Sequence, residues 1–332
     1  MIDLVEEANM GASQEIRIKV LGVGGGGCHV LHRLAQDHVQ NVSLVAVNTD
    51  EDTVNLMAKF GATGIQIGEK LTHGNGAGGK VEIGEQAAEE AAGQIEDALK
   101  EANLVFLVSC LGGGTGTGVT PVVARIAKEL GVLSIGIVTM PFRFEGRRKL
   151  RLAEEAIRKM RGQLDALIVI NNDNMLKLSK DKSLSIHDAF RAADDVLRQG
   201  IRLITDLILR SGVVNIDFAD LATVLRSSEK SEAIIGIGES RTSATDAVRN
   251  ALASPLLDRT IEGAHDIILN VVGDESLTLS SVEEASEYLR TEARTDVDMI
   301  FGSACDPEME GRIQAMVVAA NFVDKEYGDN RD

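Results

Sequence analysis

The chain has 332 residues, of which 44% are hydrophobic, and its 34 Lys and Arg against 51 Asp and Glu give a formal net charge of −17. A surface this acidic repels nucleic acid and anionic lipid, so we expect no nucleic-acid partner and no direct insertion into a membrane. No apolar run reaches the length of a membrane span, no signal-peptide pattern opens the chain, and the three scattered cysteines lack metal-ligand spacing. These features predict a cytoplasmic protein.

Strand-like and helix-like segments alternate over residues 15–184, after a polar and flexible N-terminus at 1–14. Helical patterns, among them 82–102 and 122–130, separate apolar runs that are typical of buried strands, at 16–23, 44–47, 64–67, 104–109, 133–139 and 166–170. Continuous apolar strands between helices indicate a parallel sheet with both faces covered. The fold class is therefore α/β, with a Rossmann-like nucleotide-binding domain whose ligand lies at the carboxyl ends of the strands.

A long central helix is predicted over 185–210, where Ser185 and Asp188 resemble a capping box. At 1.5 Å per residue it spans roughly 35 Å, enough to connect two domains. A smaller α+β domain is predicted over 211–322, with helices on one side of its sheet, and 323–332 is a short tail. Its strands are expected at 233–238, 266–272, 298–304 and 313–321, and its helices near 243–253 and 281–293.

Five glycines and two threonines alternate in the run Gly112–Gly118, between a strand and a helical pattern. Glycines let successive backbone N–H groups turn inward around an anion, and the following helix N-terminus adds partial positive charge. A plain glycine turn accounts for one or two glycines but not for this run. No Gly-Lys-Ser/Thr follows, so the run is not a Walker motif. It predicts a phosphate-binding loop of another kind.

A second glycine run, 22–27, closes the first strand and fits the pattern G-x-G-x-x-G. With Asp50 at the end of the second strand as the ribose-binding acid, it would suit an NAD-dependent Rossmann oxidoreductase. A dehydrogenase needs one pyrophosphate loop, whereas two glycine loops at neighbouring strand ends suit a nucleoside triphosphate. The oxidoreductase therefore stays a distant alternative.

Together these segments resemble the tubulin/FtsZ family over residues 15–322. The run at 112–118 resembles its phosphate loop, 46–50 and 74–78 its second and third nucleotide loops, 141–146 its ribose-side loop and 172–173 its guanine-contacting loop. The resemblance implies GTP or GDP as ligand. It assigns nucleotide contacts to Gly24, Gly25, Gly26, Gly27, Cys28, His29, Asn48, Asp50, Gly76, Ala77, Gly78, Gly112, Gly113, Gly114, Thr115, Gly116, Thr117, Glu145, Lys149, Asn172, Phe190 and Asp194.

Phe190 and Asp194 are four residues apart, on one face of the long helix. On local grounds alone Phe190 is a core residue. By the resemblance, Phe190 stacks on the base, and the Asp194 carboxylate accepts hydrogen bonds from guanine N1–H and its exocyclic amine. Adenine, which has an acceptor at N1, is then rejected.

Asn215, Asp217 and Asp220 lie just after the long helix. On local grounds they form a solvated helix cap. By the resemblance, this acidic loop enters the nucleotide site of the next subunit in a filament, where it positions the attacking water, while Mg²⁺ is held mainly through phosphates and water. The resemblance thus implies a GTPase that forms a head-to-tail homopolymer, with division-ring partners, located at the division site of a bacterial cell.

Several segments depart from the family pattern near the expected nucleotide, and two of the departures fall on predicted contact residues. Cys28-His29 replaces the Gly-Asn of the family pattern. Lys149 replaces an Arg, which keeps the positive charge but loses the bidentate donor geometry of the guanidinium group. These departures leave open the alternative that the chain is a family member that assembles with little or no GTP hydrolysis. The resemblance also leads us to expect a linker and a partner-binding peptide beyond residue 322. A shortened chain and a paralogue without that peptide both remain open.

Overall fold

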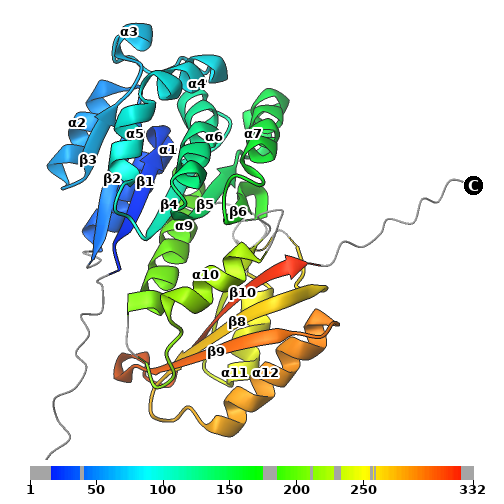
Figure 1. Ribbon diagram of the computed structural model, residues 1–332. Helices are drawn as coiled ribbons and strands as arrows, with labels where there is room; N and C mark the ends of the chain where they lie inside the picture. The colour runs from blue at the N-terminus through cyan, green and yellow to red at the C-terminus, as the bar shows by residue number, and fades with distance from the viewer. Residues whose placement is uncertain are drawn as a thin grey trace, which may run out of the picture.

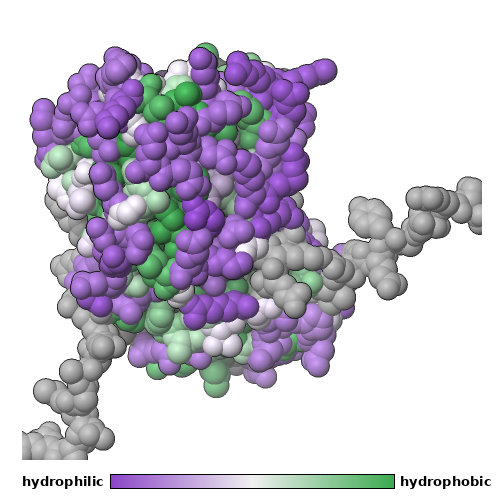
Figure 2. All heavy atoms as spheres, turned by 45° about the horizontal axis from the view of Figure 1, so that its top comes forward, coloured by the Kyte–Doolittle hydropathy of each residue, from purple (hydrophilic) through white to green (hydrophobic). Residues whose placement is uncertain are grey.

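The computed structural model describes residues 16–37, 41–174, 185–209, 212–227, 233–254, 257 and 259–322. Two sheets lie one above the other in Figure 1, and the long helix α9 (Ile186–Leu209) runs between them. The described residues include no helix that is both long and apolar enough to cross a membrane. On the face shown in Figure 2, hydrophilic residues cover most of the surface, and hydrophobic residues form smaller areas between them.

The first sheet has six parallel strands in the order β3-β2-β1-β4-β5-β6. Each predicted strand is confirmed, with bounds within two residues of those expected. Strand β4 lies in the middle of the sheet and is buried along nearly its whole length because both of its faces are covered. The strands are β1 (Ile18–Val23), β2 (Val42–Asn48), β3 (Thr63–Gln66), β4 (Leu104–Cys110), β5 (Leu133–Met140) and β6 (Ala166–Asn171).

Helices cover both faces of this sheet. One face packs on α1 and α9, and the other packs on α4 to α7, each with its own apolar core. The helices are α1 (Gly24–Gln36), α2 (Glu51–Lys59), α3 (Glu69–Thr72), α4 (Val81–Glu90), α5 (Ala92–Leu99), α6 (Gly114–Glu129) and α7 (Arg147–Met160), with a 3₁₀ turn, η1, at Arg143–Glu145.

Two predicted helices differ from those observed. The helix expected over 82–102 is broken at Ala91, whose φ of −99° and ψ of 11° separate α4 from α5. The helix expected from residue 122 begins at Gly114 instead, so the glycine-threonine run forms its first turns. Packing against α4 holds these turns in spite of the low helix propensity of glycine.

The second sheet has four strands in the order β7-β10-β8-β9, in which only β8 and β9 run parallel. Helices α11 and α12 cover one face, as expected, but α9 and α10 pack on the other, so the prediction of helices on one side only is wrong. The elements are α10 (Phe218–Arg226), β7 (Ile234–Ser240), α11 (Ala244–Leu252), β8 (Ala264–Gly273), α12 (Leu279–Ala293), β9 (Asp298–Cys305), the 3₁₀ turn η2 (Pro307–Met309) and β10 (Ile313–Phe322).

Helix α9 belongs to the cores of both sheets. The Ser185 hydroxyl caps its first turn by accepting a hydrogen bond from Asp188 N at 3.0 Å. Further along, Leu197 and Ile204 pack in one cluster with residues of the first sheet and with Met316 of the second. The helix has 24 residues, and at 1.5 Å per residue its length is about 36 Å. The helix therefore holds the parts of the molecule at its two ends at a fixed distance from each other.

Candidate functional site

The two glycine runs meet at the carboxyl ends of the adjacent strands β1 and β4. Gly24 has a φ of +70°, and a Cβ placed on it would lie 2.8 Å from the backbone N of Gly116. A Cβ on Gly26 would lie 2.5 Å from the Cys110 Sγ, whereas Gly25 and Gly113 face open space. Both runs form the first turns of helices, where backbone N–H groups have no partner within the helix. The arrangement is a cradle for an anion, and larger side chains would fill it.

The loop around residues 74–78 closes a third side of this cradle. It is fixed to the end of β2 by hydrogen bonds from Gly76 N to the Thr49 carbonyl at 3.2 Å and from Glu51 N to the Gly74 carbonyl at 3.0 Å. The hydroxyls of Thr49 and Thr115 lie 2.6 Å apart and connect β2 to α6. A Cβ on Gly114 would lie 2.9 Å from the Ala77 side chain. Segments from three parts of the chain thus form one surface.

Several predicted contact residues direct their side chains inward. Asn48 accepts a hydrogen bond from Asp50 N, and Asp50 in turn caps α2 by accepting from Thr53 N at 2.8 Å. The Thr117 hydroxyl accepts from Gly112 N at 2.8 Å. The Cys28 side chain is fully buried, and burial raises the pKa of its thiol to about 12. These side chains hold the loops in shape, so a ligand would meet mainly the backbone here.

On another side of the cradle, η1 and the start of α7 bring Glu145 and Lys149 together. The Lys149 Nζ lies 2.9 Å from Glu145 Oε2, and Glu145 Oε1 accepts a hydrogen bond from Phe142 N at 2.9 Å. A Cβ on Gly112 would lie 3.1 Å from the Lys149 Cβ, so Lys149 borders the phosphate turn. This position suits a contact with ribose or phosphate.

Three phenylalanines form a cluster next to this turn. Phe142 is buried and stacks on Phe144 with ring centroids 5.0 Å apart, and the Phe190 ring meets Phe142 edge-on at 5.1 Å. Phe190 keeps 40% of its surface exposed. It is therefore not a plain core residue, and a base could lie against its free surface.

Two side chains at this end of the molecule, Asn172 and Asp194, keep acceptor capacity for a ligand. Asn172 is buried, and its Oδ1 has no hydrogen-bond partner among the described residues. The Asp194 side chain is 16% exposed, and burial raises the pKa of its carboxyl, against the opposing effect of Arg33 and the exposed His29. A buried acceptor without a donor is costly, so these atoms fit a ligand that presents N–H groups.

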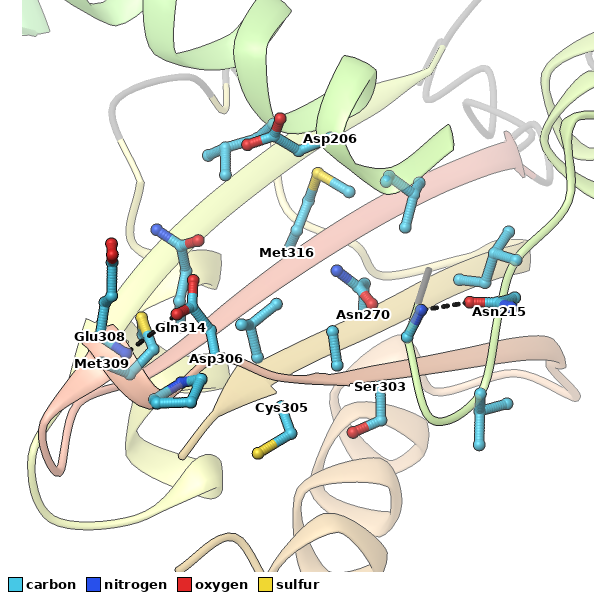
Figure 3. A pocket seen from close by; sticks show the side chains of 18 residues that line it. Asp206, Asn215, Asn270, Ser303, Cys305, Asp306, Glu308, Met309, Gln314 and Met316 are labelled. Atoms are coloured by element: carbon cyan, nitrogen blue, oxygen red, sulfur yellow. Dashed lines mark hydrogen bonds between the residues drawn. The ribbon is translucent and has the colours of Figure 1, made fainter. Parts of the chain in front are cut away.

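The acidic loop after α9 is built as a helix cap. Asp217 Oδ1 accepts a hydrogen bond from Asp220 N at 2.8 Å at the start of α10, and Asn215 Oδ1 accepts from Gly212 N (Figure 3). Val214 and Ser303 exchange two backbone hydrogen bonds, of 3.0 and 2.9 Å, which fix the loop to the edge strand β9. The locally expected cap is thus present, and the Asn215 and Asp217 side chains are exposed to solvent.

A cleft of about 640 Å³ lies between this loop, the end of α9 and the second sheet (Figure 3). Asp206 of α9 lines it together with Asn215. Asp206 is 16 residues beyond Phe190 on α9, and this separation corresponds to about 24 Å along the helix axis. The chain therefore does not bring Asn215, Asp217 and Asp220 to the glycine cradle. The described residues also hold no group of three or more His, Cys, Asp and Glu that could bind a metal ion by themselves.

Two residues that shape the cradle and its base end, Thr49 and Arg33, were not predicted from the sequence. Thr49 lies between two predicted contact residues and could have been included for its hydroxyl. Arg33 forms ion pairs with Asp194 and Asp195 of α9. The sequence pointed to Arg33 only through its spacing, because it follows the predicted contact residue His29 by four positions on one helix.

Comparisons with known proteins agree with this geometry. Residues 17–180 match the model of the tubulin/FtsZ family, GTPase domain, and residues 231–323 match that of the FtsZ family, C-terminal domain. The structure is similar to an empty FtsZ dimer of M. jannaschii, with 36% identity, a TM-score of 0.82 and coverage of 93% of this chain and 89% of that chain.

Two CetZ structures from Haloferax volcanii share the fold. The first is CetZ2 in a GTPgS-bound protofilament, with 21% identity, a TM-score of 0.76 and coverage of 94% of this chain and 95% of that one. The second is GDP-bound monomeric CetZ1, with 19% identity, a TM-score of 0.78 and coverage of 93% and 95%.

Proposed function

This chain belongs to the tubulin/FtsZ family and carries its GTPase domain, and on that premise we propose that it is an assembly-dependent GTPase. In this proposal it binds GTP or GDP at the glycine cradle and joins copies of itself head to tail. It hydrolyses GTP where two copies meet. Family membership leaves no support for the NAD-dependent oxidoreductase.

The cradle supports nucleotide binding. The backbone of Gly24–Gly27 and Gly112–Thr117 would hold the phosphates, since the first N–H groups of α1 and α6 have no partner within the helix and glycines such as Gly25 and Gly113 leave room for a ligand. Glu145 and Lys149 would contact the ribose and the nearest phosphate. Phe190 would stack on the base, with further contacts from Asn172 Oδ1, which has no hydrogen-bond partner among the described residues, and from the Asp194 carboxylate.

One observation carries the proposal for hydrolysis: the cradle and the acidic loop lie toward opposite ends of the helix α9. A head-to-tail contact would bring the loop of one copy to the cradle of the next. Asn215, Asp217 and Asp220 would then orient and polarise the attacking water. Mg²⁺, held through phosphate oxygens and water, would neutralise charge that develops during the transfer. Neither half of the site is complete in one copy.

The test is phosphate release as a function of protein concentration. We expect almost no release below a threshold concentration and a rising rate per molecule above it, with pelleted polymer appearing at the same threshold. A rate per molecule that is constant across the threshold would contradict hydrolysis at a shared site. Failure of GTP to bind at all would contradict the proposal from its first step.

A second candidate function is assembly with little or no hydrolysis. It is favoured by the Lys149 ammonium, which already pairs with Glu145 at 2.9 Å. Unlike a guanidinium group, it cannot donate two parallel hydrogen bonds to a phosphate. Polymer that pellets with GTP while releasing almost no phosphate would favour this candidate.

We further propose that the protein acts in the cytoplasm, in a division ring with partners of that ring. This is supported by the match of residues 231–323 to the FtsZ C-terminal domain. A fluorescent fusion should form a band at the division site. An even distribution through dividing cells would contradict this role without affecting the biochemical proposal.

A further inference from the structure

Five alternating charges from α1, its C-cap residue Asp37 and α9 form a chain at the base end of the candidate site. Arg33 Nη1 lies 2.7 Å from Asp195 Oδ1, and Arg33 Nε lies 3.6 Å from Asp194 Oδ2. Arg198 continues the chain, with an ion pair to Asp37 and its Nε 3.6 Å from Asp195 Oδ1. The five side chains are between 16 and 38% exposed. Such partly enclosed pairs are screened by salt much less than surface pairs.

Asp194 is the end member of this chain and the most enclosed. Its carboxylate accepts no hydrogen bond from the described residues and has only the long contact to Arg33. Arg33 is held by Asp195, at the shorter distance, and so presents its charge to Asp194 without occupying both of its oxygens. The carboxylate thus keeps acceptor capacity for a ligand.

Burial raises the pKa of Asp194, and the groups around it act in both directions. Arg33 and then His29, both on α1, lower the pKa, whereas Asp195 on α9 raises it further. The Cys110 thiol, at the end of β4, also interacts with Asp194, but burial raises its pKa to about 12, so it carries no charge near neutral pH. His29 is exposed and is cationic only when protonated. Among the described residues that act on this carboxylate, Arg33 is therefore the permanent cation.

We propose that Arg33 is a positioning residue for base recognition, which keeps Asp194 in its ionised form and is itself anchored by Asp195. Only the ionised form accepts from both N1–H and the 2-amino group of a guanine, because a protonated carboxyl turns one oxygen into a donor. The inference rests on the proposed function, in which Asp194 receives the base.

The experiment compares GTP and ATP binding to the wild type and to Arg33→Gln between about pH 8 and about pH 5.5. In the wild type we expect a GTP preference that changes little over this range. In Arg33→Gln the preference should fall toward the acid end, because loss of the cation raises the pKa of Asp194 and a growing fraction of its carboxyl is protonated as the pH falls. ATP binding should change equally little in both proteins. Arg33→Lys, which restores the charge, should restore the flat profile.

Asp37→Asn is the matched control, because it weakens the same chain of charges at the end that does not touch Asp194. It should lower the melting temperature without altering the pH profile. Arg33→Met, which keeps the packing of the aliphatic stem, gives the same readout if Arg33→Gln does not fold. A profile of Arg33→Gln or Arg33→Met that parallels the wild type overturns the inference alone. A wild type that binds GTP no better than ATP at pH 8 would contradict base recognition by Asp194. It would overturn both that part of the proposed function and the inference about Arg33.

Discussion

Lys149 is the residue whose chemistry departs most plainly from the family pattern. It lies beside the phosphate turn and pairs with Glu145 at 2.9 Å. Lys149→Arg should keep this pair and offer a second, parallel donor, so we expect GTP to bind several-fold more tightly or to turn over faster. Equilibrium binding and phosphate release measure the two effects. Equal or weaker binding together with an unchanged or lower rate would mean that the site has adapted to lysine.

Asp194 is expected to decide between guanine and adenine. Asp194→Ala removes the acceptor for two N–H groups of the base, and leaving such donors unpaired costs roughly 1–3 kcal/mol, about 5- to 150-fold in affinity. GTP binding should weaken by this factor while ATP binding stays nearly constant, as competition binding would show. Asp188→Ala, at the exposed start of the same helix, is the control and should keep the preference. Retained selectivity in Asp194→Ala would remove this residue from base recognition.

At the scale of elements, glycines let α6 and α4 approach closely. A Cβ on Gly118 would lie 2.2 Å from the Val81 carbonyl oxygen and 2.6 Å from Glu85 N, both backbone atoms. Gly118→Ala must push the two helices apart, and we expect it to lower the free energy of unfolding by about 1–3 kcal/mol. Denaturant unfolding monitored by circular dichroism would measure the change.

Gly93 in α5 is the matched control for this packing argument. A Cβ there meets no atom within 4 Å, and its φ is ordinary for a helix. Gly93→Ala should therefore stabilise the protein by about 0.5–1 kcal/mol, because alanine loses less backbone entropy in a helix. A destabilising effect of the same size at both positions would show that helix spacing is not the cause.

Helices and strands could be predicted from the sequence where the apolar residues of a segment follow a single regular pattern. Apolar runs such as 104–109 sit in a sheet covered on both faces, and the long helix keeps its spacing from end to end. The start of α6 was not predictable, since Gly114–Gly118 have low helix propensity and are helical because they pack on α4. The proposed role of Arg33 could not be predicted from the sequence for a similar reason. Its partner on α9 is about 160 positions away in the chain, and only the fold brings the two helices together.

At the scale of the whole molecule, α9 joins the two sheets through one continuous core. The glycine cradle and the acidic loop are therefore fixed relative to each other, at a separation that side chains of one copy cannot span. In the proposed head-to-tail contact, the acidic loop of one copy completes the cradle of the next. Such a heterologous contact repeats from copy to copy and continues as a filament where its rotation closes no ring.

This arrangement predicts that two inactive proteins regain activity when mixed. Asp220→Ala leaves its own cradle intact, so it should bind GTP and assemble, into polymer that turns over more slowly than the wild type. Gly114→Ala with Thr115→Ala should impair binding in its own copy, because a Cβ on Gly114 would lie 2.8 Å from Lys80 N and Thr115 loses its contact with Thr49. In a mixture, each junction between an intact cradle and an intact acidic loop is complete. Phosphate release should recover to a fraction of the wild-type rate.

Recovery requires the binding-defective protein to enter filaments, so co-pelleting of the two proteins is measured first. Asp220→Asn serves as a second loop variant, which keeps the size of the side chain and a capping oxygen while it removes the charge. If both mixtures co-assemble and neither regains phosphate release, the acidic loop does not act on the neighbouring nucleotide. Because each copy carries the two halves at opposite ends of one helix, the proposed shared site would make hydrolysis depend on assembly.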